Sequence, residues 1–165
     1  MTVVRLRTAL VAACAAWAML IVAAPLLASR AHASPAASAL ILGVYGIASL
    51  VCHQLPERSS QLWGAQMPVC ARCAGIYAGA VLGAAFALCA PASLRHGRPE
   101  VAQGFSSAWS PRIVLALAVT PTVLTLIYEW ASGDMPSHAI RAAAGAAIGL
   151  VTAWLVVAAV DNQVN

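Results

Sequence analysis

The chain has 165 residues, of which 62% are hydrophobic and only 8% are charged. Soluble domains contain roughly 25% charged and 45–50% apolar residues, so this composition excludes an ordinary soluble domain and indicates an integral membrane protein. The charged residues are nine arginines and five acids, with no lysine, for a net charge of +4. In a membrane protein this excess of positive charge influences the orientation in the bilayer and the attraction to anionic lipid headgroups. The expected partner is therefore the lipid bilayer and not a nucleic acid, and protein partners stay open.

Apolar runs divide the chain into helices. Because about 20 apolar residues in a helix cross a hydrocarbon layer roughly 30 Å thick, we expect one all-α domain, a polytopic transmembrane helix bundle of about five spans. The second run is short for a span, and the fourth contains Pro121 as an expected kink. A polar connection at 91–110 follows the third span. The expected spans are residues 8–28, 36–51, 69–90, 112–131 and 137–160.

The first run begins after Arg5 and Arg7. Its length favours a retained helix over a signal peptide cleaved after residue 33, because signal peptides have apolar regions of only ~7–15 residues. Five alternating spans place the N-terminus and residues 52–68, here called the motif loop, on one side of the membrane. That side has five arginines against four on the other. The positive-inside rule then predicts that the motif loop is cytoplasmic, in a bacterial inner membrane.

Glycines recur at every fourth position in the third and fifth spans. Helices in lipid approach each other closely where small residues face one another. The pattern therefore predicts helix-packing faces inside the bundle. The glycines are Gly75, Gly79 and Gly83 in the third span and Gly145 and Gly149 in the fifth.

The cysteines at the two ends of the motif loop suggest a metal site. Cys70 and Cys73 have the spacing of a metal knuckle at a helix start, and the preceding span ends in Cys52 and His53. Three cysteines and one histidine close a tetrahedral zinc site. The sequence therefore predicts a zinc-type site with these four ligands. Because adjacent residues do not easily bind the same ion, His138 or a water molecule is the alternative for the fourth position.

Two other interpretations of the cysteines stay open. A Cys-x-x-Cys pair at a helix N-terminus has a stabilised thiolate, so Cys70 and Cys73, with Cys52 as partner, would suit a membrane thiol–disulfide oxidoreductase that passes electrons to a quinone. A periplasmic motif loop would favour this interpretation. The remaining one is plain packing, which we expect for Cys14 and Cys89. The sequence leaves open whether the protein is an enzyme.

Charged residues near the same membrane face are candidates to support the motif. An ion pair of Glu129 with Arg72 or Arg141 would connect the motif to the last two spans, since a charge in lipid costs about 2.5–3.5 kcal/mol. Snorkelling of these side chains into the headgroups is the alternative. A small transporter would also use such charges, but the sequence lacks the paired broken helices of an inverted repeat. His138 is expected at the cap of the last span, and Arg58 is the candidate for anion binding.

The motif resembles that of a known family of small bacterial and archaeal multi-pass membrane proteins, catalogued only as a domain of unknown function. The family hallmark reads Cys-His-Gln-x-Pro-Glu-Arg-Ser, then Pro-Val-Cys-Ala-Arg-Cys-x-Gly-Ile-Tyr-x-Gly. It matches Cys52 to Ser59 and Pro68 to Gly79, including Tyr77. A looser second motif matches the stretch from Arg141 to Gly149. The resemblance implies a membrane topology and a central role for the motif, and it implies no substrate.

The resemblance extends over roughly residues 40 to 150 and has one departure. Such proteins often carry an Asp-Gly pair in the fourth helix, where this chain has Leu124-Thr125. Glu129 is then the only acid nearby. A role resting on that aspartate does not carry over to this chain.

Overall fold

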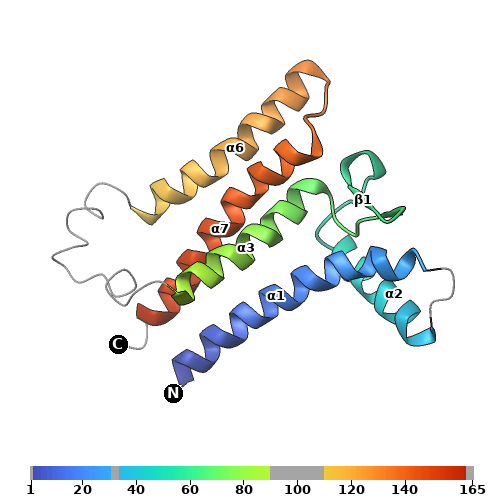
Figure 1. Cartoon of the computed structure of the whole chain (residues 1–165). Coiled ribbons are helices and arrows are strands. Elements are labelled where there is room, and N and C mark those ends of the chain that lie inside the picture. The colour runs from blue at the N-terminus through green and yellow to red at the C-terminus, as the bar shows by residue number, and fades with distance from the viewer. Residues whose placement is uncertain (1, 31–33, 90–109, 163–165) are drawn as a thin grey trace.

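The computed structural model describes residues 2–30, 34–89 and 110–162 (Figure 1). Most of these residues are helical and very few are in strands, which confirms the all-α fold class. Residues 31–33 and all but the last residue of the expected polar connection at 91–110 lie outside the described residues. The elements are α1 (Thr2–Ala28), α2 (Pro35–Ser49), the 3-10 turn η1 (Pro56–Arg58), β1 (Gln61–Leu62), β2 (Ala65–Gln66), α3 (Ala71–Cys89), α6 (Pro111–Ser132) and α7 (His138–Asn162).

Local sequence signals set several of the helix ends. The Ser34 side chain accepts a hydrogen bond from the Ala37 amide at the start of α2, and Pro35 follows as the first helical residue. Both choices suit a helix N-terminus, where amide groups lack partners within the helix. Gly133 ends α6 in the left-handed conformation, with φ of 73°, which glycine adopts without steric cost. The chain can therefore turn tightly from α6 into α7.

Of the five α-helices in the described residues, four are long and apolar enough to cross a membrane, namely α1, α3, α6 and α7. The helix α2 lies within the expected second span but has only 15 residues. At 1.5 Å per residue it is about 22 Å long, short of a hydrocarbon layer of roughly 30 Å. The described fold is thus a bundle of four candidate spans with one shorter apolar helix.

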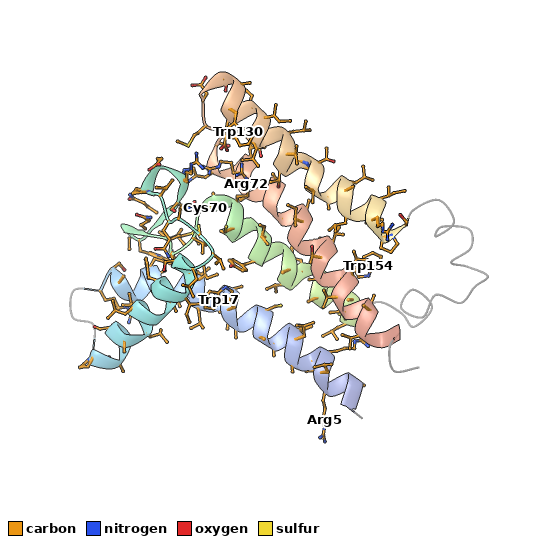
Figure 2. The ribbon with its side chains drawn as sticks, turned by 180° about the vertical axis from the view of Figure 1, so that it is seen from behind. Arg5, Trp17, Cys70, Arg72, Trp130 and Trp154 are labelled. Atoms are coloured by element: carbon orange, nitrogen blue, oxygen red, sulfur yellow. The ribbon has the colours of Figure 1, made fainter. Side chains whose placement is uncertain are left out.

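The four long helices alternate in direction, as side-chain contacts along them show. Arg7, near the start of α1, donates a hydrogen bond of 3.1 Å to the carbonyl of Ala87 near the end of α3. Thr122 in α6 donates one of 3.0 Å to the carbonyl of Ala144 in α7. Cys70 and Arg5 consequently lie at opposite ends of the bundle (Figure 2). This differs from the five-span expectation, which placed the N-terminus and the motif loop on the same side.

The helices α3 and α7 run in the same direction and are in backbone contact (Figure 1). A Cβ atom built on Gly79 would lie 2.1 Å from the carbonyl oxygen of Ala146, and one built on Gly149 would lie 1.9 Å from that of Ile76. Real Cβ atoms do not come so close to backbone, so any side chain at these positions forces the helices apart. All five glycines of the two stripes lie in this contact. They are Gly75, Gly79, Gly83, Gly145 and Gly149.

Replacing Gly79 by alanine should destabilise the bundle, because the added methyl group collides with backbone and not with a movable side chain. Overpacking typically costs about 1–3 kcal/mol. Thermal unfolding in detergent, followed by helical circular dichroism, measures the loss. Gly43→Ala in α2 is the matched control, since nothing lies within 4 Å of its added Cβ. Equal unfolding temperatures for the two variants would contradict the contact.

Candidate metal centre

Three cysteines from two separate stretches converge at one end of the bundle. Cys52 follows the end of α2, Cys70 directly precedes α3 and Cys73 lies in its first turn. Their Sγ atoms all lie within 4.8 Å of one another. The Cys70 amide donates a hydrogen bond of 3.2 Å to Cys52 Sγ. This bond joins the segment after α2 directly to the start of α3.

A small hairpin gives the motif loop its shape. The strands β1 and β2 pair antiparallel, and the turn between them places Trp63 and Gly64 at φ of 54° and 78°. Two consecutive positive φ values are typical of a tight hairpin turn whose twist matches its strands. The Met67 amide then donates to the Ser60 carbonyl at 2.9 Å. The hairpin returns the chain to α2, so that residue 70 meets residue 52.

Amide and phenol side chains tie the hairpin to α2. Gln54, with a positive φ of 51°, donates from Nε2 to the carbonyl of Tyr45 at 2.8 Å. Gln66 donates from Nε2 to the carbonyl of Gln54 at 2.6 Å, and the Tyr45 hydroxyl donates to the carbonyl of Gln66. These bonds join α2, residue 54 and the hairpin to one another. They fix the loop independently of the cysteines.

Beneath the loop lies a small apolar core. Ile21 of α1, Ala48 of α2, and Cys52, Met67 and Val69 form a buried cluster, against which Cys70 and Cys73 also pack. The ring of Tyr77 lies one turn beyond Cys73 and meets Trp17 of α1 edge to face, with centroids 6.2 Å apart. The cysteines therefore lie between an apolar core and the loop.

An arginine–glutamate–arginine set adjoins the cysteines. Arg72 donates from Nη2 to Glu129 Oε1 at 2.9 Å and to Thr125 Oγ1 at 3.2 Å. Arg141 Nε lies 3.3 Å from the same carboxylate oxygen, and only 1% of the Arg141 side chain is exposed. This confirms that Glu129 pairs with both arginines and thereby connects α3, α6 and α7. One carboxylate faces two guanidinium groups, so the set retains a positive charge.

The cysteines and three arginines line one cavity of about 150 Å³. Arg58, from η1, joins Arg72 and Arg141 there, beside the three sulfur atoms. The Nε atoms of all three arginines are buried without a hydrogen-bond partner among the described residues, although that of Arg141 lies in the ion pair with Glu129. Since a water molecule occupies roughly 30 Å³ in the liquid, the cavity has room for an ion and a small ligand.

The Cys70 thiol is the acidic member of the cysteine cluster. A hydrogen bond with Cys73 lowers the pKa of Cys70 to about 5, against the opposing effect of burial. Cys70 also lies directly before α3, where unpaired helix amides favour a negative charge. At neutral pH this group is a thiolate, able to act as ligand or nucleophile.

The structure brings together three of the four proposed ligands. Among the described residues, His53 is exposed and does not belong to the group of close donor atoms. The other candidate for the fourth position, His138, contacts the Ser60 hydroxyl at 3.2 Å through Nδ1. Sequence reasoning missed two residues at this end of the bundle, Ser60 and Thr125. Thr125 stands at the second position of the Asp-Gly pair often found in the resembling family.

Comparisons with known proteins agree with a membrane protein of unstated activity. Residues 52–155 match the family described as "Predicted membrane protein (DUF2085)". A stretch of 40 residues is 52% identical to the uncharacterized protein MJ1492 of Methanocaldococcus jannaschii, covering 24% of this chain and 26% of that protein. The match therefore spans about a quarter of the curated relative's length. No solved structure matches the chain significantly.

Replacing Glu129 by alanine should destabilise the protein, because it leaves two buried guanidinium groups facing each other without a counter-charge. Removing one partner of a buried ion pair typically costs about 3–5 kcal/mol. Thermal unfolding in detergent measures the loss. Asp134→Ala, in the exposed turn between α6 and α7, is the control and should leave stability nearly unchanged. A Glu129 variant as stable as this control would refute the role of the carboxylate.

Proposed function

Because the chain belongs to the family described as predicted membrane protein, whose description names no activity, we propose a function from the site itself. We propose that Cys52, Cys70 and Cys73 bind a zinc-type metal ion at the membrane face. The observation that carries the proposal is the convergence of their three Sγ atoms within 4.8 Å. Thiolates bind zinc at about 2.3 Å, so small rotations of these side chains suffice to surround one ion.

The proposed site is open rather than closed. Structural zinc sites use four protein ligands, whereas sites with three protein ligands keep a position for water or substrate. His53 is the fourth residue of the ligand set that the sequence predicts. It is exposed and lies outside the group of close sulfur atoms, although it lines the same cavity. The three cysteines also border the cavity that contains the arginines. The fourth position is therefore proposed to face this cavity.

We further propose that the site faces away from the cytoplasm, the reverse of the five-span expectation. With α1 as the first of four spans, Arg5 and Arg7 flank its start at the end opposite the motif loop. The chain between α3 and α6 adds Arg95 and Arg98, and α6 begins with Arg112. The motif end has four arginines, which are Arg30, Arg58, Arg72 and Arg141. Glu129 neutralises part of the charge of Arg72 and Arg141. Both the count and the flank of the first helix support a cytoplasmic N-terminus.

Thiol–disulfide exchange is the second candidate function. The proposed orientation favours it, because disulfides persist outside the cytoplasm, and so does a separate observation. An apolar cavity of about 520 Å³ between α1, α3 and α7 is lined by Trp17 and Tyr77, which also pack against the core beneath the cysteines. Such a cavity suits a quinone. The thiols of Cys70 and Cys73 would form a disulfide, and their two electrons and two protons would reduce the quinone to a quinol.

Metal analysis of the purified protein tests the leading proposal. We expect about one zinc-type ion per chain, and loss of most of it in Cys70→Ser and in Cys73→Ser because two thiolates hold the ion poorly. Cys89→Ser is the matched control, since Cys89 lies exposed at the other end of α3. Wild-type protein that is folded but metal-free would refute the proposal.

Incubation of the same preparations with a short-chain quinone separates the two candidates. In a metal site the three thiols stay reduced, and alkylation reaches them only after chelation. A disulfide between Cys70 and Cys73, formed with one equivalent of quinol, would instead establish the redox function. The Cys73→Ser variant cannot form this disulfide and serves as the blank.

Labelling of intact cells tests the orientation. We expect Gln61→Cys, in the exposed part of the hairpin, to react with a membrane-impermeant maleimide, whereas Cys89 at the opposite end reacts only after lysis. Peptide mass spectrometry assigns each adduct. Labelling of Cys89 but not residue 61 in intact cells would reverse the proposed orientation.

A further inference from the structure

Arg58 is an unpartnered guanidinium beside the cysteine cluster. Its Nε is buried without a hydrogen bond, and within the described residues its side chain takes part in no hydrogen bond or ion pair. A guanidinium carries five N–H donors, and leaving donors unmade in a buried position costs free energy. Arg58 nevertheless lines the 150 Å³ cavity with the three sulfur atoms. Its buried Nε–H therefore lacks an acceptor among the described residues, and a ligand in this cavity would provide one.

The charges around the cavity lead to the same conclusion. Arg58, Arg72 and Arg141 bring three positive charges, of which Glu129 neutralises one. Three thiolates around a divalent ion carry one net negative charge, so one positive charge remains. Arg141 is 1% exposed, and water cannot screen a charge that is so deeply buried. A single additional negative charge would bring the site to neutrality.

We propose that a small monoanion binds in this cavity, as fourth ligand of the metal and as acceptor for Arg58 and Arg141. This inference rests on the proposed metal site. The metal would bind one donor atom of the anion, and the guanidinium groups would donate hydrogen bonds to the anion from the other side of the cavity. Arginine suits this role because its planar fork fits a carboxylate or similar anion with two parallel bonds.

The size of the cavity restricts the anion to a small one. A volume of about 150 Å³ has room for several water molecules, and therefore for a short carboxylate or an inorganic anion of similar size. The site is thus proposed to recognise the charged end of a small acid or an inorganic monoanion. Lipid in the surrounding bilayer is not expected to fill it.

Cobalt-loaded protein in detergent, titrated with thiocyanate, tests this inference. Tetrahedral cobalt–thiolate centres absorb visible light, and the bands move when the fourth ligand changes. We expect a saturable shift in the wild-type protein and a Kd that is about tenfold higher in Arg58→Gln, because a charge-assisted hydrogen bond is lost. Arg58→Lys, which retains the charge without the fork, should lie between the two.

Arg112→Gln is the control, an exposed arginine at the other end of the bundle, and should titrate as the wild type does. A cobalt–thiolate spectrum that does not respond to thiocyanate would refute the anion site and leave the metal site standing. Equal affinity in Arg58→Gln and wild type would also refute it, since Arg58 carries the argument. Absence of any cobalt–thiolate band would refute the metal site, and the anion site with it.

Discussion

The backbone contact between α3 and α7 is the constraint on which the site depends. Two helices that run in the same direction can approach this closely only where neither carries a side chain at the contact. Glycines provide such positions on both helices. The contact begins near Arg72 at the start of α3 and Arg141 at the start of α7. Both guanidinium groups are thereby brought to the same carboxylate of Glu129. This close packing therefore brings two positive charges together, and Glu129 of α6 neutralises only one of them.

The cysteine cluster depends on a different set of forces. Cys70 and Cys73 are placed by the first turn of α3, but Cys52 reaches them because hydrogen bonds of Gln54 and Gln66 hold the hairpin against α2. Hydrogen bonds of the motif loop and packing of the apolar core therefore both bring the sulfur atoms together. The bundle provides a rigid base, and the loop brings the third cysteine to it.

Much of this arrangement could be predicted from the sequence, and the failures have physical causes. Glycine spacing and the Cys-x-x-Cys pair are local features, so the packing face and two of the three clustered cysteines follow directly from them. Apolar composition shows that a segment is compatible with lipid, but it does not give the length of the helix. The run at 36–51 therefore resembles a span, although α2 ends at Ser49 and is short for one. Strands of two residues show no alternation, and the hairpin was therefore invisible. Consecutive side chains point in different directions, which explains why Cys52 turns inward while His53 is exposed.

The positive charge left over by Glu129 connects the two candidate functions. The Cys70 thiol, whose pKa is lowered by a hydrogen bond with Cys73, lines the same cavity as these guanidinium groups. A thiolate is required both for binding zinc and for attacking a disulfide. Charge alone therefore does not choose between the two chemistries. The choice depends on what reaches the sulfur atoms first. A metal ion would bind all three sulfur atoms and leave the arginines to hold an anion. A quinone in the cavity near Tyr77 would instead oxidise two of the sulfur atoms and remove the negative charge that the arginines stabilise. The unpartnered Arg58 favours the first outcome, because an acceptor is still needed once the thiolates are engaged.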